Sequence, residues 1–213
     1  MTSIADIRKE YSLTTLNETD VDASPFVQFA KWWQEALASA IDEVNAMTLA
    51  TASLDGVPSA RIVLLKSYDE KGFVFFSNYE SYKGQQLAEN PRASLLFFWK
   101  ELERQIRITG MVEKINAQES DEYFLSRPAG SQIGAWASPQ SHIIANRTWL
   151  ENRVKEIELK FSNESLTRPA IWGGYRVKPV IIEFWQGRSS RLHDRLQYTL
   201  QENGSWVIER LAP

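Results

Sequence analysis

Short strand-forming runs separated by turn signals fill most of the chain, and they constrain its fold more than any other feature. The runs at 47–53 and 59–66 flank Leu54-Asp55-Gly56, where Asp-Gly is a strong hairpin signal. Further strands are predicted at 73–77, 93–99, 104–115, 175–186, 192–201 and 205–211. Strands joined by such short turns pair antiparallel, so the sequence predicts an antiparallel sheet.

Apolar residues at helical spacing predict helices before and between these strands. Ser24-Pro25 is typical of an N-cap followed by proline in the first turn, so the first helix is predicted over 25–43. Other helices are predicted at 82–90, 117–126, 131–137 and 147–161, and Pro169 with Gly173-Gly174 predicts a loop. We therefore expect a mainly β, α+β protein: an antiparallel closed or split β-barrel with peripheral helices.

Polar residues dominate 1–23, which predicts a flexible N-terminal arm. The rest, 24–213, is predicted to form a single domain because no repeat or low-complexity linker interrupts it. The N-terminus lacks the basic-then-apolar layout of a signal peptide. No apolar run reaches the roughly 18–20 residues that a membrane span needs. We expect a cytoplasmic protein with no membrane partner.

The charge and the amino-acid usage of the chain exclude several classes of function. A formal net charge of −3 gives no general attraction to nucleic acid, so any anion must bind locally. The absence of cysteine excludes disulfides, thiolate catalysis and zinc–thiolate sites. Because His142 and His193 are the two histidines of the chain, we expect no metal site.

The run Arg191-Leu192-His193-Asp194-Arg195 concentrates cations near the C-terminus. In a strand, Arg191, His193 and Arg195 would share one face, because side chains alternate with a period of two. Either an anion lies opposite that face, or the run is a charged edge strand facing water. Taken alone, the run favours the edge strand, because runs of charge are usually solvated.

Three other segments have the composition of anion sites. Arg61 and Lys66 bracket an apolar strand, but a spacing of five puts them on opposite faces. They can share a ligand through strand ends, a bulge or a partner subunit, or they can simply keep the strand soluble.

Ser81-Tyr82-Lys83-Gly84 opens a predicted helix, whose N-terminal N–H groups suit phosphate. Ser126-Arg127-Pro128 with Ser131 makes a second candidate phosphate site. Capping and turn formation explain both segments equally well when each is taken alone.

The chain holds no complete catalytic set of its own. It contains no G-x-G-x-x-G or phosphate-loop motif and no recognisable catalytic triad spacing. Several phosphate-type sites and many aromatic residues without such a set are typical of a protein that takes its reactivity from a phosphorylated cofactor.

Six segments together resemble the pyridoxine/pyridoxamine 5′-phosphate oxidase family. They are Arg61–Lys66, Ser126–Pro128 with Ser131–Ala135, Trp172–Tyr175, Glu183–Gly187, Arg191–Arg195 and Arg210–Pro213. The resemblance extends from about Asp22 to the last residue. It implies an FMN-binding split barrel that forms a homodimer, with two active sites built across the subunit interface. It also implies oxidation of pyridoxamine or pyridoxine 5′-phosphate to pyridoxal 5′-phosphate by O2, with release of H2O2.

The resemblance also implies roles for individual residues. The positions it assigns to FMN are Arg61, Ile62, Val63, Leu64, Leu65, Lys66, Phe76, Ser77, Tyr82, Lys83, Gln105, Gln140, Ser141, Trp185 and Arg195. The positions it assigns to substrate are Lys66, Tyr123, Arg127, Ser131, Arg191, His193, Arg8 and Tyr11. Of these, Arg191 and His193 are the implied catalytic residues.

The chain departs from the family pattern at two places. Tyr82 stands where the family usually has an arginine that contacts the FMN phosphate. Arg8–Tyr11 resembles a family segment that can close over the substrate, but Ser12–Thr19 replaces the basic residues that usually follow it.

Two alternatives remain open from the sequence. One is a related FMN oxidase that acts on another aromatic substrate, such as a phenazine precursor. The other is a non-catalytic flavin- or haem-binding barrel. Retention of Tyr123, Arg127 and Ser131 together favours the vitamin B6 phosphate as substrate.

Overall fold

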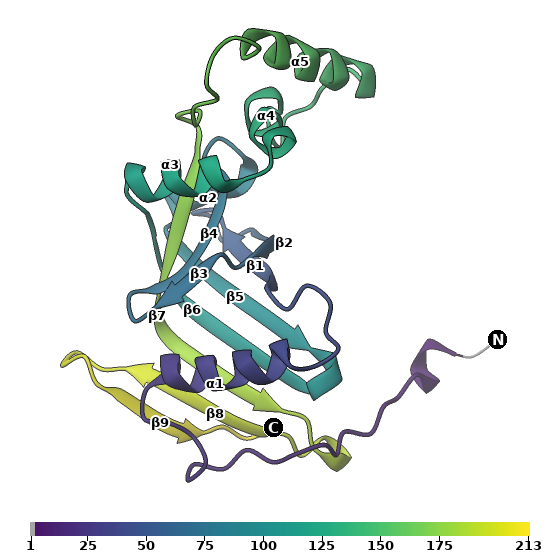
Figure 1. The fold of residues 1–213 in the computed structure, drawn as a ribbon. Coiled ribbons are helices and arrows are strands. Elements are labelled where there is room, and N and C mark those ends of the chain that lie inside the picture. Colours follow the sequence, from purple (N-terminus) through teal and green to yellow (C-terminus); the bar gives the residue numbers. More distant parts are fainter. Residues whose placement is uncertain (1–2) are drawn as a thin grey trace.

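Nine antiparallel strands form a continuous sheet within residues 3–213, the part of the chain that this computed structural model describes (Figure 1). The strands are β1 (Ala46–Ala52), β2 (Pro58–Leu64), β3 (Ser67–Asp69), β4 (Gly72–Asn78), β5 (Arg92–Trp99), β6 (Arg104–Lys114), β7 (Trp172–Gln186), β8 (Asp194–Leu200) and β9 (Trp206–Arg210). Their order is β2-β1-β5-β6-β7-β4-β3, and β8 and β9 extend the sheet from β7. The predicted antiparallel sheet is confirmed, and β3 is a short strand that the sequence did not reveal.

The two ends of this strand order meet at a corner of the chain. β2 and β3 are consecutive in sequence, and Leu65-Lys66 joins them. The Leu65 N–H donates to the Asn45 carbonyl at 2.8 Å, and the Lys66 N–H donates to the Val74 carbonyl in β4 at 2.9 Å. The predicted strand 59–66 therefore ends at Leu64, because the chain turns here to reach β4. Lys66 no longer follows the alternation of β2.

The long strand β7 connects the two halves of the sheet. Trp172–Val177 pairs with β4, and Ile181–Gln186 pairs with β8 on the same edge, while β6 follows the other edge. The loop predicted at Gly173-Gly174 is wrong, because both glycines are paired strand residues. A Cβ on Gly173 would lie 2.1 Å from the Tyr79 hydroxyl, so close packing is what requires glycine.

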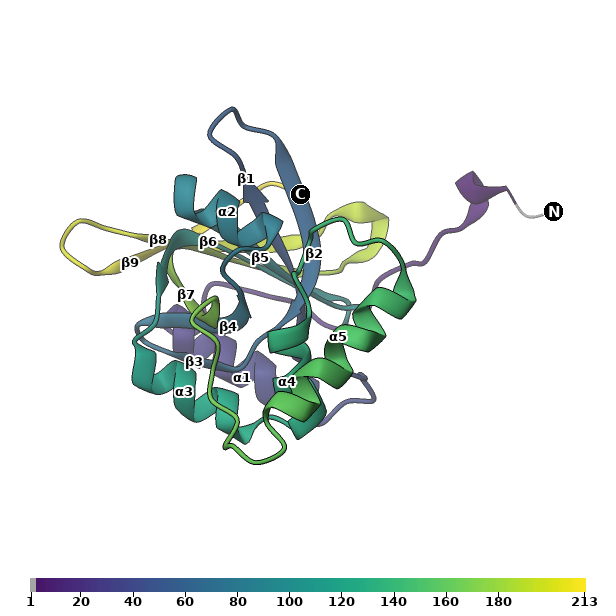
Figure 2. The same cartoon turned by 90° about the horizontal axis from the view of Figure 1, so that it is seen from above.

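Five α-helices lie outside the sheet within the described chain. They are α1 (Pro25–Leu37), α2 (Tyr82–Glu89), α3 (Ala117–Ser126), α4 (Ala129–Ala137) and α5 (Arg147–Lys160). α1 lies along one side of the sheet, whereas α3, α4 and α5 gather at the other end of the molecule (Figure 1). Seen from above, α3, α4 and α5 lie together along one edge of the molecule (Figure 2). No helix within residues 3–213 has the length and apolarity needed to cross a membrane.

Helix α1 is shorter than predicted. It ends at Leu37 rather than at residue 43. The Ser39 hydroxyl donates to the Ala36 carbonyl at 2.7 Å and accepts from the Ile41 N–H at 3.3 Å. These local hydrogen bonds compete with the helical ones, so the chain leaves the helix there.

The core between α1 and the sheet is largely aromatic. Phe29 of α1 is fully buried, with ring centroids 4.7 Å from Tyr68, 4.9 Å from Phe73 and 5.6 Å from Phe97. Such edge-to-face contacts stabilise the core beyond their buried area. Many of the aromatic residues therefore pack in the core, where Trp32, Trp99, Phe75, Phe184 and Tyr198 are also buried.

The strand predicted over 192–201 begins only at Asp194. Before it, the 3-10 turn η3 (Ser189–Arg191) contains positive φ angles of 55° at Ser190 and 61° at Arg191. The Arg188 N–H donates to His193 Nδ1 at 3.1 Å and holds this loop together. The prediction that Arg191, His193 and Arg195 share one strand face is therefore wrong, because only Arg195 belongs to β8.

Replacing Phe29 with alanine should lower the free energy of unfolding by about 3–5 kcal/mol, because it opens a cavity beneath α1. Urea unfolding followed by circular dichroism measures this change. The matched control is Leu159→Ala on α5, where Leu159 is 75% exposed and the change should stay within about 0.5 kcal/mol. A loss below about 1 kcal/mol for Phe29→Ala would contradict this description of the core.

Candidate functional site

A cavity of about 920 Å³ lies between β2, β4 and the helices α2, α3 and α4. We call it the anion cavity. The residues that line it are Arg61, Ile62, Val63, Leu64, Lys66, Phe76, Ser77, Asn78, Tyr82, Lys83, Tyr123, Arg127, Pro128, Ser131, Gly134, Ala135, Ser138, Gln140, Ser141 and Trp172. Its size is that of a site for a cofactor and a small molecule.

The lining of the anion cavity is strongly basic. Four of its side chains are cationic: Arg61, Lys66, Lys83 and Arg127. Among the described residues, none that lines the cavity is acidic. In a chain of net charge −3, this local concentration of positive charge would attract an anion to the cavity.

The first pair of cations in the anion cavity is Lys83 and Arg61. The Ser81 side chain caps α2 by accepting from the Gly84 N–H at 3.3 Å, which places Lys83 in the first turn. Lys83 Nζ is buried, and it donates to Ser77 Oγ and Gln140 Oε1, both at 3.1 Å. Burial, reinforced by the charge of Arg61, lowers the pKa of Lys83 to about 8.

The second pair of cations, Lys66 and Arg127, lies against a stack of aromatic rings. The Phe76 ring stacks on Tyr123 at 3.9 Å and on Trp172 at 5.4 Å between centroids. The Arg127 guanidinium lies 4.5 Å from the Trp172 ring centroid, and Lys66 Nζ lies 5.9 Å from that of Tyr123. Arg127 Nη1 is buried and has no hydrogen-bond partner within the described chain. An unpaired buried donor is costly, so this atom indicates a ligand acceptor.

The anion cavity brings together most of the predicted site. The predicted residues that line it are Arg61, Ile62, Val63, Leu64, Lys66, Phe76, Ser77, Tyr82, Lys83, Tyr123, Arg127, Ser131, Gln140 and Ser141. Leu65 does not, because its side chain is 4% exposed and belongs to the hydrophobic core. Asn78 and Ser138 also line the cavity, and sequence reasoning missed both. Their position at the end of a predicted element could have indicated them, since Asn78 is the last residue of β4 and Ser138 is the C-cap of α4.

A second group of predicted residues lies outside the cavity. Strand register places Gln105, Trp185 and Arg195 in one cross-strand row. The His193 ring lies 4.6 Å from Trp185, and the Tyr11 ring lies 5.8 Å from it. We call Tyr11, Gln105, Trp185, His193 and Arg195 the Trp185 cluster.

The remaining two predicted residues are not brought to the anion cavity either. Arg191 is exposed in η3, next to the Trp185 cluster. Arg8 is exposed on the arm, where its Nε donates to the Ala5 carbonyl at 3.3 Å. Residues 1 and 2 of the predicted arm lie outside the described residues.

Comparison with known families gives a consistent match along the chain. Residues 33–161 match the family described as pyridoxamine 5′-phosphate oxidase. Residues 172–213 match the pyridoxine 5′-phosphate oxidase C-terminal dimerisation region. The chain is 61% identical to the pyridoxine/pyridoxamine 5′-phosphate oxidase of a Nostoc species, over 99% of each chain. It is 57% identical to that of Cupriavidus pinatubonensis, over all of both chains.

Solved structures confirm the fold. PhzG from Burkholderia lata, in complex with tetrahydrophenazine-1-carboxylic acid, superposes with a TM-score of 0.89 at 31% identity, covering 96% of this chain and all of that one. A pyridoxamine 5′-phosphate oxidase-related, FMN binding protein from Nostoc punctiforme gives a TM-score of 0.70 at 15% identity, covering 89% and 98%. The second likeness bears on the fold alone. The predicted split barrel is thereby confirmed.

The pKa of Lys83 predicts a pH dependence for anion binding in the cavity. Lys83 is protonated below pH 8 and loses its charge as the pH rises through about 8. Sulfate remains a dianion between pH 7 and 9, so its affinity should fall about tenfold over this range. Calorimetric titration with sulfate at several pH values measures this fall in affinity.

The matched control for this pH dependence is Lys83→Gln, which should bind sulfate weakly at both pH values. A pH step of equal size in that variant would show that another group causes it.

Proposed function

The chain is an oxidoreductase of the pyridoxamine 5′-phosphate oxidase family, and from that premise we propose that it oxidises pyridoxamine or pyridoxine 5′-phosphate to pyridoxal 5′-phosphate. FMN would be its cofactor and O2 its electron acceptor, with H2O2 as the second product. The observation that carries the proposal is the anion cavity, which combines two pairs of cations with an aromatic stack and has no acidic side chain among its described lining residues. This arrangement suits two planar ligands that each carry a phosphate.

The residues present fit FMN. Arg61 and Lys83, with the hydroxyl and amide groups of Ser77 and Gln140, offer charge-assisted donors of the kind that hold a phosphate. Ile62 and Val63 would provide apolar contacts for the ring system. When bound, FMN would supply the acceptor for the hydride equivalent that leaves substrate carbon C4′.

A separate set of residues would hold the substrate phosphate. Arg127 offers the unpaired buried Nη1, which needs an acceptor. Lys66 approaches from the corner between β2 and β3, and Tyr123 and Ser131 add hydroxyl groups. Fixing the phosphate in this way orients the rest of the substrate for reaction.

The Trp185 cluster would complete each site from the other subunit of a homodimer. It lies outside the anion cavity of its own chain, and its members Trp185, His193 and Arg195 lie in the segment that matches a dimerisation region. Phe98, which pairs with Gln105 in the same row, is 54% exposed, and Ile62 at the cavity is 65% exposed. In a chain whose C-terminal segment matches a dimerisation region, such exposed apolar side chains are candidates for the subunit interface. We infer that the partner's surface covers them.

His193 would orient the substrate ring together with Arg191. Because the Arg188 N–H donates to His193 Nδ1, that nitrogen is the acceptor, and Nε2 carries the proton of the neutral ring. Nε2 is therefore a donor toward a substrate oxygen or nitrogen. This favours a positioning role for the imidazole over the role of an obligatory base.

The phenazine alternative receives less support. The relative whose structure holds tetrahydrophenazine-1-carboxylic acid is 31% identical, whereas the pyridoxine/pyridoxamine 5′-phosphate oxidases reach 57–61%. The Arg127 Nη1 donor, which has no partner within the described chain, would donate to either a phosphate or a carboxylate of a ligand, so the sequence identities carry this preference. Identity to named oxidases over the full length likewise argues against a non-catalytic barrel.

Replacing Arg127 with methionine should raise the KM for pyridoxamine 5′-phosphate by about 10- to 100-fold, because a charge-assisted contact to phosphate is lost. FMN affinity, measured by quenching of flavin fluorescence, should change less than threefold. The control Arg147→Met removes an exposed arginine that pairs with Glu151 on α5, and it should behave like the wild type. An unchanged KM for Arg127→Met would remove Arg127 from the substrate site.

A mixed dimer tests whether two chains share each site. Arg127→Met removes the proposed phosphate contact in the anion cavity. Arg191→Met removes the proposed contact to the substrate ring from the turn next to the Trp185 cluster. If sites form across the interface, a heterodimer of the two variants contains one doubly altered site and one intact site. At a substrate concentration well below the wild-type KM, its rate should then be about half that of the wild type, although each variant homodimer reacts about tenfold or more slowly.

Purification through two different affinity tags isolates that heterodimer. Activity as low as in the homodimers would mean that both residues serve the same chain's site.

A further inference from the structure

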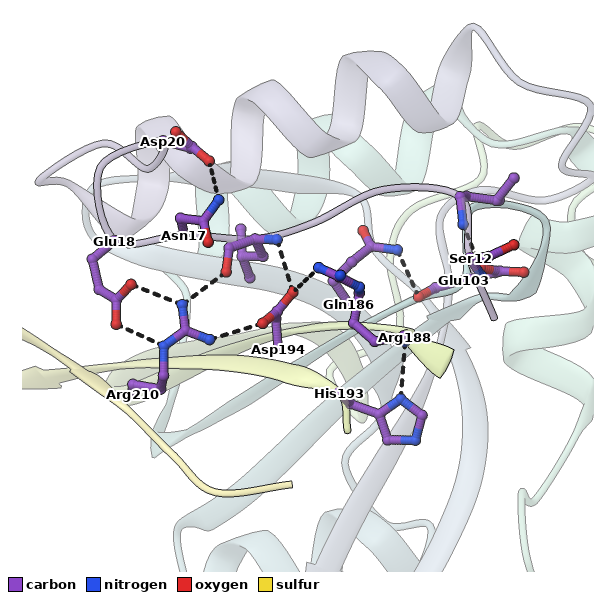
Figure 3. Close-up of polar contacts among 12 residues, drawn as sticks. Ser12, Asn17, Glu18, Asp20, Glu103, Gln186, Arg188, His193, Asp194 and Arg210 are labelled. Carbon is purple, nitrogen blue, oxygen red and sulfur yellow. Dashed lines mark hydrogen bonds and ion pairs between the residues drawn. The ribbon is translucent and has the colours of Figure 1, made fainter. Parts of the chain in front are cut away.

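Glu103 is a buried carboxylate that binds the N-terminal arm. It lies between β5 and β6 with a left-handed φ of 54°, and its side chain is 3% exposed. Its Oε2 accepts from the backbone N–H groups of Ser12 at 2.8 Å and Leu13 at 3.1 Å (Figure 3). Lys9 Nζ lies 3.3 Å from Oε1. A buried carboxylate is tolerated only when its charge is compensated, and here the arm compensates it.

The hydrogen bonds keep this carboxylate charged. Burial acts to raise the pKa of Glu103, but donation from Leu13, Ser12 and Lys9 outweighs it, so the pKa lies below its ordinary value. The arm and the carboxylate therefore stabilise each other.

Glu103 also contacts the strand that carries Trp185. Its backbone carbonyl accepts from the Gly187 N–H at 2.7 Å and from Gln186 Nε2 at 3.2 Å. The same residue thus fixes the arm by its side chain and the end of β7 by its main chain. The relative position of these two segments is set at one point.

The arm segment fixed in this way places Tyr11 over the Trp185 cluster. The Tyr11 ring meets Trp185 edge-on at 5.8 Å and lies 6.0 Å from the His193 ring. A Cβ on Gly187 would come within 2.8 Å of the Tyr11 ring, so glycine makes room for it. Beside Tyr11, Glu10 Oε1 accepts from the Ser190 N–H at 2.7 Å, next to Arg191.

We propose that Glu103 is a positioning residue of the substrate site: it anchors residues 9–13 so that Tyr11 forms one wall beside His193. The role rests on the proposed function, which assigns Tyr11 and His193 to the substrate. The anchor acts on a chain segment and touches neither the anion cavity nor its cations.

A second anchor keeps the remainder of the arm in place. Asp194 Oδ2 accepts from the Leu16 N–H at 3.1 Å, and Arg210 pairs with both Asp194 and Glu18 (Figure 3). Leu16 itself is 4% exposed in the core. Loss of Glu103 should therefore release residues 9–13 without unfolding the protein.

The test compares Glu103→Gln with Glu101→Gln in the FMN-loaded protein. Hydrogen exchange should show faster exchange of the Ser12 and Leu13 amides in Glu103→Gln. The KM for pyridoxamine 5′-phosphate should rise about tenfold, with kcat within twofold and FMN affinity unchanged. Glu101, in the same turn, pairs with its neighbour Lys100 at 3.5 Å, so Glu101→Gln should match the wild type in every readout.

The variant Tyr11→Ala provides a second, independent test. If Glu103 acts through Tyr11, adding Glu103→Gln to Tyr11→Ala should raise KM no further. A further tenfold rise in the double variant would overturn the proposal, as would unchanged amide exchange or a loss of FMN affinity in Glu103→Gln. Wild-type turnover with an unchanged KM in Glu103→Gln would overturn the role of Glu103 alone. A wild-type protein that does not oxidise pyridoxamine 5′-phosphate would overturn the proposed function and, with it, this role.

Discussion

The pairing of β7 with three other strands supports both halves of the candidate site. Its first residues pair with β4 beside the anion cavity, and its last residues pair with β8 and carry Trp185. Strand β6 follows the opposite edge and keeps the two halves in one sheet. The hydrogen bonds of a single strand therefore set where the cavity lies relative to the Trp185 cluster. Gly173 allows this pairing, because Tyr79 occupies the space that a side chain would need.

Charge is distributed differently in the two halves. In the C-terminal half, Arg210 pairs with Glu18 at 2.7 Å and with Asp194 at 2.8 Å. In the anion cavity, by contrast, the described lining offers no carboxylate to Lys83 or Arg127. Carboxylates that pair with a cation neutralise its charge within the fold, whereas cations without such a partner retain their attraction for an anionic ligand. This contrast separates structural arginines from candidate binding residues in a way that composition does not.

Much of the local structure followed from the sequence. The helix over 117–126 has the predicted bounds, because Asn116 caps it with a side-chain acceptor for the Glu119 N–H. Two of the errors occurred where a contact distant in sequence decided the backbone. Gly173-Gly174 is strand because β4 pairs with it, and the Arg191 turn is irregular where Glu10, some 180 residues earlier, accepts from Ser190. Local propensity contains no signal for either contact.

The sequence by itself determined the residue types of the site, and its resemblance to a family determined which positions to consider. The sequence could not decide which of these residues lie together in the anion cavity and which lie in the Trp185 cluster. Arg61 and Lys66 share a cavity because the barrel turns a corner after Leu64, which overrides the alternation of the strand. Gln105, Trp185 and Arg195 of the Trp185 cluster lie apart from that cavity because strand register places them in a row of their own. Glu103 gave no sequence signal, since its role depends on backbone N–H groups that only the folded arm brings to it.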